Sequence, residues 1–420
     1  MMPLVRLAML SAWNRRFTLG LMLIAVALST TLLLGIDRVR HEVRNGFTQS
    51  VSGTDLVVGA RTSPVQLMLY AIFRLGGATN NISWSSAQKL SSNPAVAWTI
   101  PLSLGDSHRG FPVLATNDNY FKFFHYGDRR ALRFAEGRHF QTVFETVLGS
   151  EVAERLHYKI GDRIVLSHGT SEMNLSDHAD KPFTVIGILA RTGTPVDKTA
   201  HISLEAMEAI HLDWEGGAPL PGMTIPPELV KKFDLTPKTV TAVLVGLKSR
   251  AGVFALQREI ANEKSEPLMA VLPGVALDEL WQVVGIGEKA LLAVSAMVMA
   301  VGLAGLASSI LASLGERRRE LAVLRSVGAR PADIFFLLSI EGFFVMLTGV
   351  LLGVVLLTAS FFIFGPFLET RFGVAFRVTL PTIAEFQSLL WIVGAGFAVS
   401  LLPGFRAYRV SLSDGLSPRI

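Results

Sequence analysis

The residues most able to do chemistry in this chain are its nine histidines, because imidazole is the commonest metal ligand among side chains. All nine lie between positions 41 and 211, and none has the His-x3-His or His-Glu-x-x-His spacing that pairs two ligands on one helix. His168 and His178, close to Asp177 and Asp180, come nearest to forming a cluster. We therefore assign no metal site from the sequence and keep His168 and His178 as the candidates for one.

No motif supports catalysis by the chain itself. The sequence has no Gly-x-Ser-x-Gly nucleophile elbow, and so does not indicate a hydrolase of that kind. The phosphate-binding pattern GxxxxGK[ST] is absent, and no Gly-Lys pair occurs anywhere. Cysteine is also absent, which rules out disulfides and thiolate metal ligands. We predict no catalytic residue and no cofactor bound by this chain, so any energy from ATP must come from a partner.

The composition indicates that a membrane positions these residues. Only 17% of the chain is charged, against about 25% in soluble proteins, while 50% is apolar. Most of the apolar excess lies in four runs of 20, 25, 35 and 17 residues, where a helix needs roughly 20 to cross a bilayer: Phe17–Ile36, Ala290–Leu314, Ile334–Leu368 and Leu389–Phe405. We predict four transmembrane helices, one before and three after a large domain.

The arginines set the expected orientation. They lie before the first run, between the second and third, and after the fourth, at Arg6, Arg15, Arg16; Arg317, Arg318, Arg319, Arg325, Arg330; and Arg406, Arg409, Arg419. The positive-inside rule then puts both termini and the 316–333 loop in the cytoplasm. Arg38, Arg40 and Arg44 oppose this, but they open a long domain, where the rule is weak. The basic residues form no single soluble patch, so nucleic acid is not an expected partner. The first run lacks a small-x-small cleavage site and is expected to be retained as an anchor.

Residues 37–289 have ordinary globular composition and should form an extracytoplasmic α+β domain. Short β-branched runs predict strands at Asp55–Gly59, Val185–Leu189 and Val240–Gly246. Helical spacing predicts helices at Ser85–Leu90, Gly149–Leu156, Leu204–Ile210 and Val253–Ala261. The domain is expected to have two lobes, with 140–235 as a possible insertion between segments that pair with each other.

The second apolar run is expected to begin outside the membrane. Leu277–Leu314 lacks proline and stays apolar across Glu288 and Lys289, which predicts one continuous helix. Gly285 and Gly287 weaken a helix, and a flexible hinge there is the alternative.

The segment Ser313–Asp333 between the second and third runs predicts a short basic amphipathic helix. Two glutamates would lie near its start and three apolar residues along one side: Glu316, Glu320; Leu321, Leu324, Val327. Gly328 can supply the left-handed residue that ends the helix, and Pro331 suits the first turn of the third span. The alternative is a basic loop that only sets topology and contacts lipid phosphates.

Three residues of the third run could have special roles. Glu341 is an ionisable residue inside a membrane span, which makes it a functional candidate by default. Its position near the cytoplasmic end favours contact with interfacial water or an arginine over a proton relay. Gly349 and Gly353 form a GxxxG pair, which allows close helix packing either within the chain or across a dimer.

The stretch ERRRELAVLRSVGARPADIFFLLSIEGFFVMLTGVLLG closely resembles the signature of FtsX-like permeases, the MacB and LolC type of ABC transporter subunit. The positions that match the family pattern are Glu316, Arg317, Glu320, Leu321, Leu324, Arg325, Gly328, Ala329 and Glu341. The one-plus-three arrangement of spans is similar, as are DLVVGA, ETVLGSEVAERLHYKIGDRIVL and the tail RVSLSDGLSP. The resemblance extends over nearly the whole chain.

The resemblance implies a non-enzymatic permease subunit of the cell inner membrane. It divides the chain into 1–36, 37–289 (a MacB-like periplasmic domain) and 290–420 (an FtsX-like permease domain). Members of the family dimerise and bind two copies of an ATP-binding subunit, which holds the ATP and Mg²⁺. Their coupling helix, here about 316–329, docks on that ATPase, and the long second helix relays motion to the periplasmic domain, which is called mechanotransmission.

Several functions remain open at this point. The alternatives to transport are a membrane regulator that activates a cell-wall hydrolase, or a subunit of a metal-linked (for example zinc) or lipoprotein-handling system. The extracytoplasmic domain of about 250 residues favours transport, because the membrane regulators of the same superfamily normally carry smaller extracytoplasmic domains. A periplasmic adaptor or binding protein is a possible further partner, in addition to membrane lipid.

Overall fold

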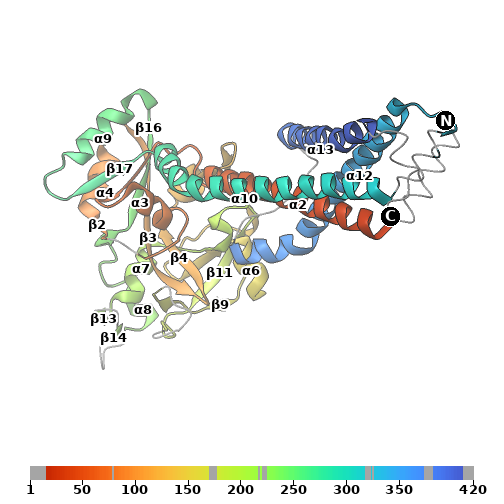
Figure 1. Ribbon diagram of the computed structural model, residues 1–420. Coiled ribbons are helices and arrows are strands. Elements are labelled where there is room, and N and C mark those ends of the chain that lie inside the picture. Colours follow the sequence, from red (N-terminus) through yellow and green to blue (C-terminus); the bar gives the residue numbers. More distant parts are fainter. Residues whose placement is uncertain are drawn as a thin grey trace. The chain divides into compact units, whose positions relative to one another are not determined.

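The chain forms two compact units, shown in Figure 1. The computed structural model describes residues 16–77, 80–169, 177–215, 218–219, 225–316, 323, 326–372 and 382–409. The first unit takes the described residues of 1–42, 285–369 and 376–420, and the second takes those of 43–284 and 370–375.

The first unit is built from long helices. Their bounds are α2 Arg16–Gln49, α10 Pro273–Glu316, α12 Pro331–Phe372 and α13 Ile383–Arg409. Among the described residues these four helices are long and apolar enough to cross a membrane. Each contains one of the four predicted apolar runs. The predicted helix Leu277–Leu314 is confirmed, since α10 is helical throughout and includes Gly285 and Gly287.

Two of these helices begin at sequence-encoded caps. Pro331 is the first residue of α12, where its missing N–H is not needed, and the Asp333 carboxylate accepts the backbone N–H of Arg330 at 2.7 Å. At the start of α13, Glu385 Oε2 accepts the Thr382 N–H at 2.7 Å and Thr382 Oγ1 accepts the Glu385 N–H at 3.2 Å. This reciprocal capping box satisfies two backbone donors that the helix leaves unpaired.

The second unit is organised around an eleven-stranded mixed sheet. The strand order is β17-β1-β16-β3-β4-β12-β8-β11-β7, with β10 paired to β3 and β9 paired to β11. The bounds are β1 Leu56–Ala60, β3 Val96–His108, β4 Phe111–Thr116, β7 Phe134–Gly137, β8 Glu145–Leu148, β9 Arg163–Ile164, β10 Ser167–His168, β11 Phe183–Leu189, β12 Ala200–Ser203, β16 Ala242–Leu247 and β17 Leu268–Val271. The three strands expected from the sequence correspond to β1, β11 and β16. Strands from 140–235 lie in the same sheet as strands outside that range, and the division into lobes stays a prediction.

Apolar side chains cover both faces of this sheet. Val57 contributes to one core cluster, whereas its neighbours Leu56 and Val58 contribute to the other, as expected when successive residues point to opposite faces. The helices that pack on it are α3 Pro64–Ala71, α4 Trp84–Ser92, α5 Asn119–Phe123, α6 Ser150–Leu156, α7 Leu204–His211 and α9 Val253–Ala261. A further short helix of this unit is α8 Pro227–Val230. The four helices predicted from the sequence are α4, α6, α7 and α9. Short two-stranded ribbons join β2 Ile82–Ser83 to β15 Thr239–Val240, β5 His125–Tyr126 to β6 Arg130–Ala131, and β13 Trp214–Glu215 to β14 Ala218–Pro219.

The thirteen-residue strand β3 links the two halves of the sheet. Its first part, from Val96 to Leu102, pairs with β16, and its second part, from Ser103 to His108, pairs with β4 and β10. The register against β4 shifts between Leu104 and Ser107. Such a bulge changes the direction in which local side chains point. Asp106 lies within it.

Candidate functional site

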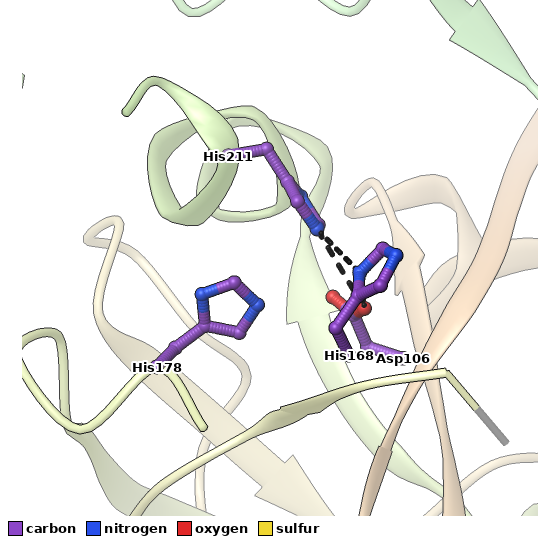
Figure 2. Close-up of side chains that lie close together, drawn as sticks. All are labelled: Asp106, His168, His178 and His211. Carbon is purple, nitrogen blue, oxygen red and sulfur yellow. Dashed lines mark hydrogen bonds and ion pairs between the residues drawn. The ribbon is translucent and has the colours of Figure 1, made fainter. Parts of the chain in front are cut away.

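Four side chains of the second unit converge in one place: Asp106, His168, His178 and His211 (Figure 2). Each offers one ligand atom, and these atoms all lie within 4.8 Å of one another. We call this group the histidine cluster. His168 and His178 are the two candidates noted in the sequence. The carboxylate that joins them is Asp106, rather than Asp177 or Asp180.

Strand pairing brings Asp106 and His168 together. In the antiparallel pair of β10 with β3, His168 lies directly opposite Asp106, so both side chains leave the same face of the sheet. His168 Nδ1 lies 3.1 Å from Asp106 Oδ1. The Asp106 side chain is fully buried, whereas 37% of the His168 side chain is exposed.

His211 reaches the cluster from the last residue of α7. This helix begins beside β12, where Ser203 caps it by accepting the N–H of Ala206. His211 Nδ1 lies 2.8 Å from the Met207 carbonyl oxygen and therefore donates to it, since a carbonyl can only accept. The other nitrogen, Nε2, faces His168 Nδ1 at 3.2 Å and Asp106 Oδ1 at 3.7 Å.

His178 completes the cluster from the segment between β10 and β11. It is fully buried, and neither of its ring nitrogens has a hydrogen-bond partner among the described residues. Figure 2 shows one of these nitrogens facing the other three side chains. The ring of Trp214 covers His178 at a centroid separation of 4.1 Å.

A buried lysine ties the segments of His178 and His211 together. Lys181 is fully buried, and its Nζ lies 2.6 and 2.8 Å from the two Asp213 oxygens and 2.8 Å from Asp180 Oδ2. Asp213 also accepts the backbone N–H of Ile225. These contacts hold the two histidines at their present separation.

The environment separates the protonation states of the cluster. Burial lowers the pKa of His178 to about 4, which leaves a neutral imidazole with a lone pair at neutral pH. Burial by itself would raise the pKa of Asp106, but the hydrogen bond with His168 and the nearby imidazoles of His211 and His178 hold it at about 2. Burial would by itself lower the pKa of His211, but the nearby Asp106 carboxylate raises it instead. The arrangement therefore combines a buried carboxylate with imidazoles that can accept a cation or a proton.

The predicted coupling segment is described only in part. Glu316 is the last residue of α10, and Ala329 is half-buried in the turn before α12. Gly328 has φ +106°, the positive value expected for the residue that ends a helix. The remaining coupling residues lie outside the described residues: Arg317, Glu320, Leu321, Leu324 and Arg325.

The glycine pair of α12 packs inside the chain. A Cβ atom added to Gly349 would lie 2.7 Å from Val26 Cγ1, and one added to Gly353 would lie 2.8 Å from the Ala27 carbonyl oxygen. Thr31 Oγ1 donates a hydrogen bond to the Gly353 carbonyl at 3.0 Å. The pair thus lets α2 and α12 approach closely.

Glu341 has a half-buried side chain on α12. The first unit also contains a buried ion pair that the sequence did not predict. Arg38 Nε lies 3.1 Å from Glu385 Oε1, with both side chains less than one tenth exposed. Arg38 also lies over the Phe361 ring. Arg40 forms a second ion pair, at 2.6 Å, with Glu288. The sequence offers two signals for the Arg38–Glu385 pair, namely the arginines after the first apolar run and the capping pattern at Thr382. Neither signal identifies the pair, because Arg38 and Glu385 are 347 residues apart.

Four apolar helices with a large mixed-sheet unit between the first and second define a polytopic membrane protein with a periplasmic-type domain. Residues 17–263 match the family "MacB-like periplasmic core domain", and residues 292–412 match "FtsX-like permease C-terminal". The chain belongs to the MacB-type ABC transporter permeases. The helices and the family together indicate a protein of the inner membrane with a periplasmic domain.

The alignments with individual relatives cover only part of each relative's length. "Macrolide export ATP-binding/permease protein MacB 1" of Yersinia pestis bv. Antiqua (strain Antiqua) is 32% identical over 124 residues, which are 30% of this chain and 18% of that protein. "Lipoprotein-releasing system transmembrane protein LolC" of Neisseria meningitidis serogroup B (strain ATCC BAA-335 / MC58) is 24% identical over 296 residues, 65% of either chain. The chain spans less than two thirds of each relative.

Solved structures of the periplasmic region are also similar. The periplasmic region of MacB from Actinobacillus actinomycetemcomitans aligns with a TM-score of 0.34 and 10% identity, covering 56% of this chain and 94% of that one. The extracellular domain of the noncanonic ABC-type transporter YknZ from Gram-positive bacteria aligns with a TM-score of 0.29 and 12% identity, covering 52% and 98%.

Proposed function

We propose that this chain is the non-catalytic permease subunit of an ATP-driven ABC complex. A separate ATP-binding chain, which carries ATP and Mg²⁺, docks on the cytoplasmic segment 316–329. Its hydrolysis cycle moves α10 and, through it, the periplasmic domain, which exports or extracts the substrate. Two permease chains and two ATP-binding chains form the complex, and a periplasmic adaptor or binding protein delivers or receives the cargo.

The observation that carries this proposal is the FtsX-like match over 292–412, within which 316–329 joins two apolar helices. The segment carries arginines and an apolar stripe, and Gly328 supports a helix end there by its positive φ. A partner with a groove for that stripe would bury Leu324. The absence of a GxxxxGK[ST] pattern supports the placement of ATP hydrolysis outside these 420 residues.

The test replaces one residue on the apolar face of the proposed coupling helix and one on the opposite face. Leu324→Asp puts a charge into the proposed contact, which costs several kcal/mol when the charge is desolvated and unpaired. Ser326→Asp adds the same charge about 200° around the helix, away from the stripe, and is the matched control. We expect Leu324→Asp to reach the membrane normally and to lose binding of the ATP-binding chain at least tenfold, while Ser326→Asp retains it. Equal binding by both variants would mean that the segment is only a topogenic basic loop.

Lipoprotein extraction is a second candidate, favoured by the LolC match over 65% of this chain. In that case an acylated lipoprotein should stimulate ATP hydrolysis by the purified complex, and its non-acylated form should not. Equal effects of the two forms would exclude this candidate and leave export of another substrate.

A further inference from the structure

The histidine cluster carries an inference that the permease function does not require. We propose that Asp106, His168, His178 and His211 bind one divalent first-row transition metal ion, and that Zn²⁺ fits the site best. The site is formed by side chains of the second unit alone. Its existence can therefore be tested without any ATP-binding partner.

The donor set selects the class of ion. Three imidazole nitrogens and one carboxylate oxygen suit Zn²⁺ and its first-row neighbours. Mg²⁺ and Ca²⁺ prefer shells of oxygen ligands, and the cluster provides one such side chain. Structural zinc sites are almost always tetrahedral with four ligands, and the cluster provides four.

The spacing of the donors is close to what such an ion needs. Zinc–ligand distances near 2.0–2.1 Å place tetrahedral ligands about 3.3 Å apart. His168 Nδ1 already lies 3.1 Å from Asp106 Oδ1 and 3.2 Å from His211 Nε2. No pair of the ligand atoms is farther apart than 4.8 Å. Movements of the ligand atoms by about an ångström, through side-chain rotation, would therefore bring all four into a tetrahedral shell around the ion.

Unpaired buried atoms supply an independent indication of a ligand. Both ring nitrogens of His178 and the Oδ2 atom of Asp106 are buried without a hydrogen-bond partner among the described residues. Each such atom costs free energy, because folding removes its water without replacement. A metal ion bound by a His178 nitrogen and the Asp106 carboxylate would compensate this cost.

The surroundings orient the imidazoles as metal sites require. Metal-binding histidines usually donate their second ring N–H to a carbonyl or carboxylate, which fixes the tautomer. His211 does so through Nδ1 to the Met207 carbonyl, and its Nε2 faces the cluster. In the segments that carry His178 and His211, Lys181 meets the carboxylates of Asp180 and Asp213. These contacts tie the two segments to each other and so help to fix the positions of the two histidines.

The ion would have a route in from solvent. The side chains of His168 and His211 are 37% and 27% exposed, whereas those of His178 and Asp106 are buried. The Trp214 ring lies against the His178 ring, and this large side chain beside the site limits water around the ion.

The experiment uses the full chain, purified in detergent, stripped with a chelator and titrated with Zn²⁺ against a chromogenic competitor. We expect one tightly bound Zn²⁺ per chain, X-ray absorption that reports three imidazole ligands, and the visible spectrum of a tetrahedral site with Co²⁺. His178→Gln should weaken Zn²⁺ binding at least tenfold. His168→Gln should do the same, and because this side chain is partly exposed, the variant should fold even if His178→Gln does not.

His201→Gln is the matched control, because His201 is also fully buried with an unpartnered Nε2 but lies outside the cluster. It should bind Zn²⁺ like the unmodified chain. Stoichiometric binding that all variants share would place the ion elsewhere and overturn the proposal. Absence of stoichiometric binding by the unmodified, folded chain would overturn it as well. Neither result would bear on the Leu324→Asp test of the permease function.

Discussion

At the residue scale, the second unit depends on a charge buried in its interior. The Lys181 ammonium is fully buried and bonds to both Asp213 oxygens and to Asp180. Removing one partner of such a pair leaves the other charge without compensation, which typically costs 3–5 kcal/mol. The pair also joins the segments that carry His178 and His211, so its loss should affect both stability and the geometry of the histidine cluster.

We therefore expect Lys181→Met to destabilise the second unit by about 3 kcal/mol. In a domain of this size that lowers the unfolding temperature by roughly 6–12 °C, measurable by tryptophan fluorescence of the full chain in detergent. Lys122→Met is the control, because Lys122 is exposed. Equal unfolding temperatures for the two variants would show that the buried pair contributes nothing measurable.

At the element scale, the contact between α2 and α12 depends on small residues. In lipid the hydrophobic effect does not drive helices together, so close packing and hydrogen bonds must hold them. The contact offers both, because Gly353 allows the backbones to approach and Thr31 donates to its carbonyl. Elsewhere in the same unit, Glu385 caps α13 and pairs with Arg38, so one side chain links a helix start to α2.

Gly353→Ala should loosen this contact. The added Cβ would lie 2.8 Å from the Ala27 carbonyl oxygen and 2.7 Å from Thr30 Cβ, so backbone must move. Overpacking of this kind costs about 1–3 kcal/mol. We expect a lower temperature of aggregation for the full chain in detergent. Gly394→Ala is the matched control, since nothing lies within 4 Å of its added Cβ. Identical behaviour of the two variants would refute the packing role.

At the scale of the whole molecule, the distribution of arginine predicts the orientation in the membrane. A periplasmic reporter fused near Ser171 should be active, because the segment between the first and second spans is expected outside the cytoplasm. The same reporter at Ala329 should be inactive, and a cytoplasmic reporter should give the opposite pair of results. The two fusion sites act as controls for each other. The reverse pattern at either site would defeat the four-span topology.

The sequence by itself predicted the features that depend on neighbouring residues. The apolar runs anticipated α2, α10, α12 and α13, because a bilayer requires about 20 consecutive apolar residues and such a run is visible without any partner. Periodicity likewise anticipated α4, α6, α7 and α9, and the family motif could be recognised from Glu316 to Glu341. The positive φ of Gly328 also followed from its place after a helical pattern.

Only the tertiary structure decided which distant residues meet. Asp106 and His168 are 62 residues apart and His211 is 43 further on, so no local spacing could connect them. Their meeting depends on the β10–β3 register, on the bulge around Asp106 and on the end of α7. A shift of one residue in that register would turn His168 to the other face of the sheet. The tertiary structure therefore brings Asp106 and His211 next to His168 and His178, which the sequence had indicated only as candidates.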